Sequence, residues 1–130
     1  PFFIKTIKTK NSKGKVTSSF LDIEEINIET VSNIKESIKE VFLLITVLDK
    51  YKRKIFSAEI ALDNIKTLRI MPKCLTRGTY SLQFIIYRPA IAQYDIIEDA
   101  CEFNIIDAGS EFSHLEKFDY GCVYGNYEWH

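Results

Sequence analysis

The feature that most constrains this chain is a strict alternation of apolar and polar side chains, because successive residues of a β-strand point to opposite faces of a sheet. The clearest example is residues 79–87, which follow Arg77-Gly78 and precede Pro89. One face of this segment carries Tyr80, Leu82, Phe84 and Ile86, and the other carries Ser81, Gln83, Ile85 and Tyr87. The segment therefore predicts a strand whose first face, including Tyr80, lies in a core.

Other short segments alternate in the same way or are rich in β-branched and aromatic residues, which suit a pleated surface. We expect strands over residues 3–9, 16–20, 26–32, 41–48, 53–58, 66–71, 101–106 and 121–129. Residues 59–65 are expected to form a loop with at most one helical turn, and the acidic residues 94–100 an irregular segment. Short strands at this spacing predict an all-β fold, an antiparallel immunoglobulin-like or jelly-roll β-sandwich of about eight or nine strands.

Residues 41–48 form the longest apolar run and are apolar at every position except Thr46. This run is much shorter than the ~20 residues that span a bilayer. It instead predicts a central strand that is covered on both faces. In a two-sheet sandwich the second apolar face needs a partner, a ligand or a subunit.

Length and cysteine content favour one intracellular domain. A chain of 130 residues with 46% hydrophobic residues can build one core, so we expect a single domain over residues 1–130. The cysteines Cys74, Cys101 and Cys122 are odd in number and lack a CxxC spacing, which suits reduced thiols in the cytosol. The chain begins at Pro1 without a signal-peptide pattern, so we expect it to be part of a longer protein.

The charges are unevenly distributed although the net charge is only −1. Residues 1–88 contain 16 Lys and Arg against 9 acids, whereas residues 89–130 contain 9 acids against Lys117 alone. Such a split can bring opposite charges together across the sandwich or across a dimer, or it can describe ordinary solvated faces. Nucleic-acid binding would need a basic surface with interspersed aromatics, so no nucleic-acid partner is expected.

The sequence carries no complete nucleotide or metal motif. Gly14-Lys15 lacks a phosphate-binding loop because Thr9 stands where that loop needs Gly, and Val16 stands where it needs Ser or Thr. His114 lies in an acidic loop without a second histidine nearby. We therefore expect no metal and no cofactor.

Glycoside hydrolysis needs two carboxylates that flank the bond to be broken. Asp95, Glu98 and Asp99 lie within five residues of one another, which is more typical of a turn or hydrogen-bonding cluster. There is no GxSxG nucleophile motif either. The chain is expected to be non-enzymatic, and a hydrolase that would shorten a polysaccharide stays as an alternative.

From Gly78 onward the sequence carries several distinctive short pieces. They are Gly78-Thr79-Tyr80-Ser81-Leu82, the run from Tyr94 to Phe103, Gly109-Ser110-Glu111-Phe112, Asp119-Tyr120-Gly121-Cys122-Val123 and the closing Glu128-Trp129. In order and spacing they resemble the "G-x-Y-x-L" strand, the "YD…A…F.V" segment and the "G-x-V…W" close of the C-terminal, polysaccharide-binding domain of Wzt, the ATPase component of bacterial O-antigen ABC exporters.

The first 77 residues resemble that family only in pattern. After Phe20 the chain has Leu21-Asp22-Ile23-Glu24-Glu25 where the family often has Gly-Glu, and Asp49-Lys50 stands in place of Asp-Gly. These differences bear on which polysaccharide is recognised, because related domains recognise different ones.

The resemblance implies a cytoplasmic module at the inner membrane. It implies attachment behind a nucleotide-binding domain that works with the transporter's membrane subunit. Its ligand would be lipid-linked O-antigen polysaccharide, bound near the chain end and marked for export. It also implies a homodimer formed by exchange of the C-terminal strand, for which the candidate residues are Val123, Tyr124, Tyr127 and Trp129.

A sugar site should combine hydrogen-bonding groups with aromatic rings on one sheet face, because sugars present hydroxyls and apolar C–H faces. Candidate residues are Ser81, Gln83 and Tyr87, with Phe42 and Thr46 from a neighbouring strand and Arg69 as a planar donor. Tyr94 and Asp95 are expected to lie in a loop beside this site. The alternatives are that these are ordinary solvated strand residues, or that the face docks a protein without binding sugar.

Overall fold

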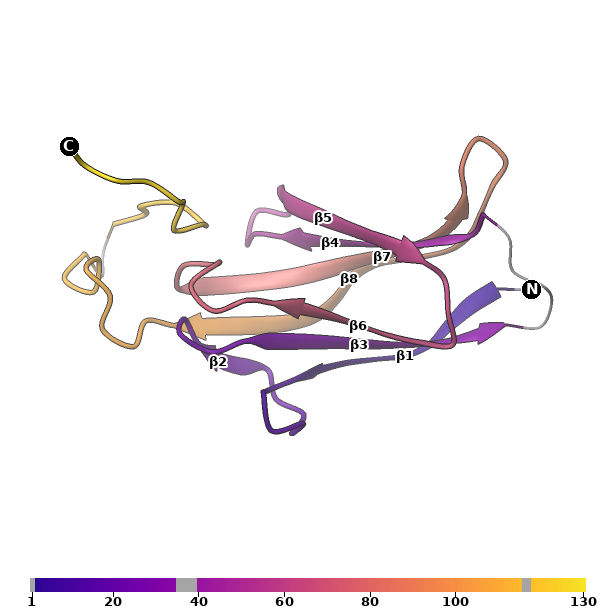
Figure 1. Cartoon of the computed structure of the whole chain (residues 1–130), viewed down its shortest axis with the longest axis horizontal. Helices are drawn as coiled ribbons and strands as arrows, with labels where there is room; N and C mark the ends of the chain where they lie inside the picture. The colour runs from indigo at the N-terminus through magenta and orange to yellow at the C-terminus, as the bar shows by residue number, and fades with distance from the viewer. Residues whose placement is uncertain (1, 35–39, 116–117) are drawn as a thin grey trace.

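The chain folds into two stacked β-sheets (Figure 1). The computed structural model describes residues 2–34, 40–115 and 118–130. Its strands are β1 (Phe2–Lys10), β2 (Ser19–Leu21), β3 (Ile26–Ile34), β4 (Phe42–Leu48), β5 (Lys54–Ala61), β6 (Ile65–Ile70), β7 (Gly78–Arg88) and β8 (Ala92–Ile106). Among the described residues there is no helix.

A three-stranded sheet in the order β1-β3-β6 packs against a five-stranded sheet in the order β2-β8-β7-β4-β5. Neighbouring strands are antiparallel except for the short β2, which pairs parallel with the end of β8. The predicted all-β sandwich is confirmed, with one parallel pair that side-chain alternation could not indicate.

The core lies between the two sheets and follows the alternation seen in the sequence. On β7, Leu82, Phe84 and Ile86 are fully buried, and Tyr80 is only 3% exposed. The inner side chains of β4 (Leu43, Ile45 and Val47) pair with this row, and Ile26 and Ile28 of β3 face it from the other sheet. Burial of each such side chain stabilises the fold by roughly 1.5–3 kcal/mol.

Strand β4 is central, as predicted, because it pairs with β5 on one side and β7 on the other. Its second face is covered only in part. Thr46 and Leu48 are buried, whereas Phe42 and Leu44 are partly exposed. An apolar strip therefore reaches the surface at the Phe42 end of the strand.

The prediction that residues 94–100 are irregular is wrong, because these residues belong to the first half of β8. The interruption that the acids indicated is a bulge. Asp99 and Cys101 have positive φ angles of 58° and 49°, and the β7–β8 register shifts nearby. A bulge breaks the alternation of side chains without ending the strand.

Three further boundaries differ from the sequence-based expectation. Residues 59–61 continue β5, and the chain then turns at Asp63-Asn64 without a helical turn. Residues 16–20 are mostly irregular, since Val16 makes only an isolated bridge to Lys10 and β2 begins at Ser19. The predicted final strand 121–129 is also absent: within these residues Val123 alone forms a bridge, to Leu75.

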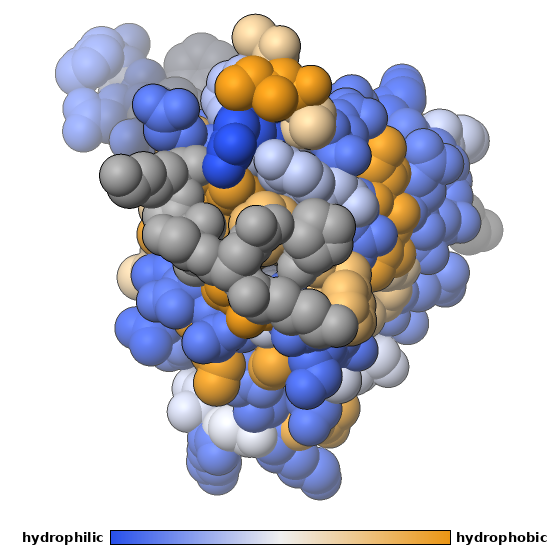
Figure 2. Space-filling view, turned by 90° about the vertical axis from the view of Figure 1, so that its right-hand side faces the viewer, coloured by the Kyte–Doolittle hydropathy of each residue, from blue (hydrophilic) through white to orange (hydrophobic). Residues whose placement is uncertain are grey.

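The end of the sandwich at the right of Figure 1 carries the β7–β8 hairpin and faces the viewer in Figure 2. Apolar side chains appear there in separate patches between polar ones. Nowhere in the described part of the chain is there a helix with the length and hydropathy to cross a bilayer.

Candidate functional site

The side of the five-stranded sheet that faces away from β1-β3-β6 gathers most of the predicted site residues. We call it the outer face. Strand register places Phe42 opposite Tyr87, and Thr46 opposite Gln83. Its side chains from β4 and β7 include Phe42, Leu44, Thr46, Leu48, Ser81, Gln83, Ile85 and Tyr87. Five of the six residues proposed for sugar binding therefore share one surface.

One end of the outer face is aromatic. The rings of Phe42 and Tyr87 lie with centroids 6.1 Å apart and planes tilted by 42°. The Tyr87 hydroxyl donates to the Glu59 carboxylate on β5. This hydrogen bond, together with burial, raises the pKa of Tyr87. The two rings and the acceptor form a corner that suits an apolar sugar face with an adjoining hydroxyl.

The middle of the outer face is polar. Thr46 Oγ1 and Ser57 Oγ share a hydrogen bond of 2.7 Å, beside the partly exposed Gln83. Ile85 and Leu44, also partly exposed, separate this polar part from the aromatic corner. Hydrogen-bonding groups and aliphatic surface therefore alternate along the same strands.

Ser81 is less accessible than the sequence suggested. Its side chain is buried, and the Lys52 ammonium donates to Ser81 Oγ at 3.2 Å. Lys52 also pairs with Asp99 across the β8 bulge. That hydrogen bond from Lys52 lowers the pKa of Asp99. A ligand at this point would meet Lys52 and Asp99, two residues that sequence reasoning did not place here.

Arg69 does not join the outer face, which corrects its assignment to that surface. It lies on β6 in the other sheet and is paired with β3. Its Nε donates to Asn27 Oδ1 at 3.2 Å and lies 2.9 Å from Glu25 Oε2. The alternation of residues 66–71 predicted the strand but not the sheet to which it belongs.

Tyr94 and Asp95 also differ from expectation, because they contact β1 instead of bordering the outer face in a loop. The ring of Tyr94 packs edge-on against Phe2 with centroids 4.9 Å apart. Asp95 Oδ2 accepts a 2.8 Å hydrogen bond from the backbone N–H of Ile4, next to a register shift in β1. Both side chains therefore fasten the two sheets together.

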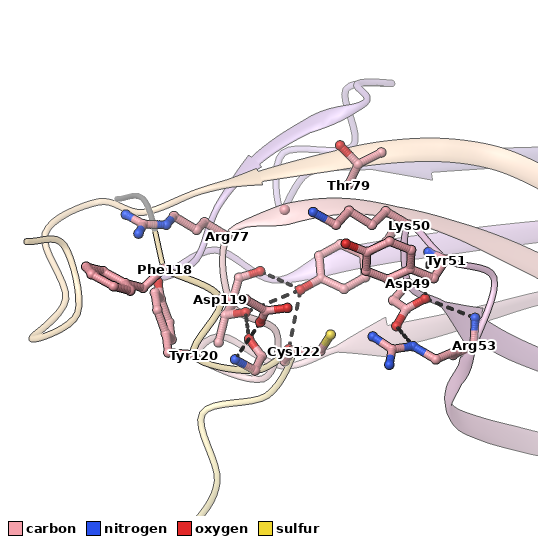
Figure 3. Close-up of a pocket in the computed structure, with 14 residues that line it drawn as sticks. Asp49, Lys50, Tyr51, Arg53, Arg77, Thr79, Phe118, Asp119, Tyr120 and Cys122 are labelled. Carbon is pink, nitrogen blue, oxygen red and sulfur yellow. Dashed lines mark hydrogen bonds and ion pairs between the residues drawn. The ribbon is translucent and has the colours of Figure 1, made fainter. Parts of the chain in front are cut away.

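A cavity of about 280 Å³ lies at the left-hand end of the sandwich in Figure 1 (Figure 3). We call it the end pocket. It lies between the β4–β5 turn, the start of β7 and residues 118–122. Its walls include Asp49, Lys50, Tyr51, Arg53, Arg77, Thr79, Phe118, Asp119, Tyr120 and Cys122. Thr79 belongs to the same strand as Ser81, so the pocket adjoins the outer face.

The end pocket is shaped by buried hydrogen bonds. The Tyr80 hydroxyl donates to the Thr76 carbonyl at 2.7 Å, and the Thr76 hydroxyl donates to the Gly121 carbonyl. Burial raises the pKa of Tyr80 to about 12, so the phenol stays protonated at neutral pH. These bonds hold residues 121–122 against the start of β7.

The β4–β5 turn forms the opposite wall of the end pocket. Asp49 accepts hydrogen bonds from the backbone N–H of Tyr51 and of Arg53 and from Arg53 Nε, at 2.8–2.9 Å. Burial on its own would raise the pKa of Asp49, but the hydrogen bonds from Arg53 and Tyr51 outweigh it and lower the pKa. Nothing in the sequence indicated that residues 118–122 would lie opposite this turn.

The four residues proposed for a dimer strand divide into two pairs. Val123 bridges Leu75, and the Tyr124 hydroxyl donates to Asp22 at 2.7 Å, so both contact their own chain. Tyr127 and Trp129 are 56% and 91% exposed and pack edge-to-face. Val123 is itself half exposed, and every residue from Gly125 to His130 is exposed.

Among residues 2–34, 40–115 and 118–130, no group of three or more His, Cys, Asp or Glu side chains is arranged to hold a metal ion. Glu116, one of the acids near His114, lies outside the described residues.

Comparison with known proteins gives a match in structure but none in sequence. No family model and no curated protein sequence matches the chain. A solved structure, the crystal structure of the C-terminal domain of Wzt, superposes with a TM-score of 0.71 over 99% of this chain and 84% of that one. The chain has the fold of the C-terminal domain of Wzt.

The likeness to Wzt extends over the first 77 residues, where the sequence resemblance was one of pattern alone. Sequence identity is 10%, so the likeness concerns the fold. The fold of the chain and the short sequence pieces between Gly78 and Trp129 nevertheless resemble the same domain.

Proposed function

We propose that this domain binds a polysaccharide along the outer face. The observation that carries the proposal is the sequence of surfaces along β4 and β7: an aromatic corner at Phe42 and Tyr87, an aliphatic stretch, and polar groups around Gln83. Sugar rings stack on aromatic faces through their C–H groups and hydrogen-bond through their hydroxyls, so they need this mixture.

The outer face has the length for an extended chain. From Thr79 to Tyr87 a strand rises about 26 Å, at roughly 3.3 Å per residue. Several consecutive sugar units fit along that distance. A polymer bound in this way gains affinity from many weak contacts, and each contact positions the next sugar unit.

The fold and the sequence resemblance support a specific ligand and setting. The ligand would be lipid-linked O-antigen polysaccharide, bound in the cytoplasm near its chain end. The domain would act without catalysis as part of an O-antigen ABC transporter. Its partners would be an attached nucleotide-binding domain and the transporter's membrane subunit, and it would form a homodimer through the C-terminal segment. The Wzt fold and the ordered pieces after Gly78 support this assignment.

Isothermal titration calorimetry of the domain with purified O-polysaccharide tests the proposal. The double variant Gln83→Ala/Tyr87→Ala should weaken binding at least tenfold, because it removes both a stacking ring and a hydrogen-bonding side chain. Arg69→Gln is the matched control, since Arg69 lies on the other sheet and should leave affinity unchanged.

Two results would argue for other functions. A domain that binds no polysaccharide at millimolar concentration but forms a stable dimer would be a docking or oligomerisation module. Shortened chains after incubation would indicate a hydrolase. Equal affinity of the double variant and the wild type, with the fold intact, would place the sugar somewhere other than the outer face.

A further inference from the structure

The first strand and the turn after it carry positive charge without any acidic residue. Residues 2–20 contain five lysines and no Asp or Glu. Strand β1 is an edge strand of the three-stranded sheet, and Figure 1 shows it along the lower side of the sandwich, with the turn after it projecting downward. We call this surface the lysine edge, and its residues are Lys5, Lys8, Lys10, Lys13 and Lys15.

Most charges of the lysine edge have no acidic partner. Lys10 is the exception, with its Nζ 3.0 Å from Glu29 Oε2 on β3. The other four lysines are exposed and form no ion pair with any residue in the ranges 2–34, 40–115 and 118–130. Their ammonium groups are therefore available to an anionic surface outside the chain.

The turn after β1 holds two of these lysines together at its tip. Asn11 Oδ1 accepts hydrogen bonds from the backbone N–H groups of Lys13 and Lys15, both at 3.0 Å. The Asn11 N–H donates to the Lys15 carbonyl at 2.9 Å, and Gly14 supplies the positive φ of 79° that closes the turn. The turn is thus fixed by its own hydrogen bonds before any partner binds.

Exposed apolar side chains lie among the lysines. Val16 forms an antiparallel bridge to Lys10, and residues directly opposite each other in such a pair have their side chains on the same face. Val16 is 57% exposed, and Phe3 near the start of β1 is 43% exposed. Lysines around exposed apolar side chains are typical of surfaces that lie on anionic bilayers, because the ammonium groups attract headgroups while the apolar groups enter the headgroup boundary.

Protection of an edge strand does not account for this charge. Lysines on an edge strand hinder pairing with another chain. Strand β5 is also an edge strand, and its eight residues carry one lysine and one acid, Lys54 and Glu59. An edge that is entirely positive over β1 and the following turn therefore indicates attraction to a negative surface.

The composition of the lysine edge favours lipid over nucleic acid. Proteins that bind single-stranded nucleic acid stack the bases on exposed aromatic rings. Two of the three aromatic residues among residues 2–20, Phe2 and Phe20, are buried in the core. Lysine ammonium groups are flexible point charges, which suit the phosphates of a fluid headgroup layer.

We propose that the lysine edge binds the anionic headgroups of a phospholipid bilayer. The four unpaired lysines would contact phosphate oxygens, and Val16 would enter the headgroup region. The outer face belongs to the other sheet and would stay free for a ligand. This inference goes beyond the proposed function and does not rest on it, because attachment to a transporter needs no direct contact with lipid.

Co-sedimentation of the domain with vesicles tests the proposal. One set of vesicles contains phosphatidylcholine alone, and the other contains equal parts of phosphatidylcholine and phosphatidylglycerol. The domain should bind the anionic vesicles at least about tenfold more tightly than the neutral ones at low ionic strength, and this binding should weaken as salt rises.

Lysine variants locate the contact. Lys13→Gln/Lys15→Gln should weaken binding to the anionic vesicles at least about tenfold, because each lysine near such a surface contributes about fivefold. Adding Lys5→Gln and Lys8→Gln should reduce binding to the level seen with phosphatidylcholine. Circular dichroism should show the native fold in both variants, since these exposed side chains form no ion pair within the described residues.

A second double variant is the matched control. Lys50→Gln/Lys54→Gln removes the same charge from exposed positions in the β4–β5 turn and at the start of β5, in the other sheet. It should change vesicle binding by less than about twofold, because charges far from the contact are screened.

The proposal is overturned if the domain does not prefer anionic vesicles, or if the two double variants lose equal affinity. It is also overturned if short double-stranded DNA binds as tightly as anionic vesicles at the same phosphate concentration, which would indicate a nucleic-acid surface. Polysaccharide titration separates it from the proposed function. Lys13→Gln/Lys15→Gln should keep the wild-type affinity for polysaccharide, and a loss there would place sugar instead of lipid at the lysine edge.

Discussion

Asp22 is a buried carboxylate that joins three segments distant in sequence. Its side chain accepts hydrogen bonds from the Tyr124 hydroxyl at 2.7 Å and the Ala108 N–H at 2.9 Å, and Lys73 Nζ lies 3.7 Å away. A buried charge is stable only when its oxygens are satisfied. One residue of the β2–β3 connection therefore fixes the approach of the C-terminal segment to the sandwich.

Removing the Tyr124 hydroxyl should destabilise the fold. Tyr124→Phe leaves one oxygen of Asp22 without its hydrogen-bond donor, so the free energy of unfolding in urea should fall by about 1–3 kcal/mol. Tyr127→Phe is the control, because Tyr127 is exposed and should change stability by less than about 0.5 kcal/mol. Equal effects of the two variants would mean that the contact with Asp22 contributes little.

Asp107 should make stability depend on pH in the acid range. Burial alone would raise its pKa, but hydrogen bonds from the Ser110 hydroxyl and from the Ser110 and Gly109 N–H groups, with the nearby Arg77 charge, lower it to about 2. The unfolded value is 3.8. A carboxylate with a lowered folded-state pKa contributes stability above the unfolded value and loses it as pH falls through the folded one.

Asp107→Asn isolates that contribution. Urea midpoints measured between pH 2 and pH 6 should show the variant less stable than the wild type above about pH 4. The difference should shrink as pH falls and be nearly gone at about pH 2. A difference in stability that stays constant from pH 2 to pH 6 would show that the charge of Asp107 does not stabilise the fold.

At the scale of elements, substitutions on the two faces of β7 test whether these faces have separate roles. Phe84 points into the core and is fully buried, whereas its neighbour Ile85 lies on the outer face and is partly exposed. Phe84→Ala should cost about 3–5 kcal/mol of unfolding free energy and leave any sugar contact intact in the folded fraction. Ile85→Ala should cost about 1 kcal/mol and weaken polysaccharide binding. Calorimetric unfolding and titration together would expose an inverted assignment of the faces.

Elements defined by side-chain alternation were predictable, and those defined by main-chain pairing were not. The strands around residues 26–32 and 79–87 were predicted because one face of each is buried, which requires period two, and the strand over residues 41–48 was predicted because its run of apolar residues indicates cover on both faces. The first half of β8 was missed because the bulge at Asp99 and Cys101 interrupts that period. The parallel pairing of β2 depends on backbone hydrogen bonds, which leave no pattern in the side chains.

The candidate site shows the same difference between residues that side-chain alternation predicts and residues that depend on how the strands are assembled. Alternation placed Ser81, Gln83 and Tyr87 on one face, and pairing with an apolar strand added Phe42 and Thr46. Arg69 was misplaced because a single strand's pattern does not say which sheet it joins. The end pocket was missed altogether, since it requires the β4–β5 turn to meet residues 118–122.

At the scale of the whole molecule, part of the charge asymmetry is compensated within one chain. Lys52 of the basic part pairs with Asp99 of the acidic part, and the charge of Arg77 contributes to lowering the pKa of Asp107. The acidic C-terminal segment is thus held to its own sandwich as far as Tyr124. Beyond that point Tyr127 and Trp129 project with large exposed ring surfaces.

Those exposed rings make a sharp test of the proposed dimer, because Trp129 is the only tryptophan of the chain. Fully burying a large aromatic side chain yields several kcal/mol, so an exchanged segment should carry Trp129 into the partner's surface. Its fluorescence maximum should then move to shorter wavelength as protein concentration rises, in step with the increase in mass measured by light scattering. Deletion of residues 125–130 should leave thermal stability nearly unchanged, since the anchor at Tyr124 remains, and should yield a monomer. A dimer in which Trp129 emission stays that of a water-exposed ring, or one that survives the deletion, would place the interface on another surface and leave the C-terminal residues outside it.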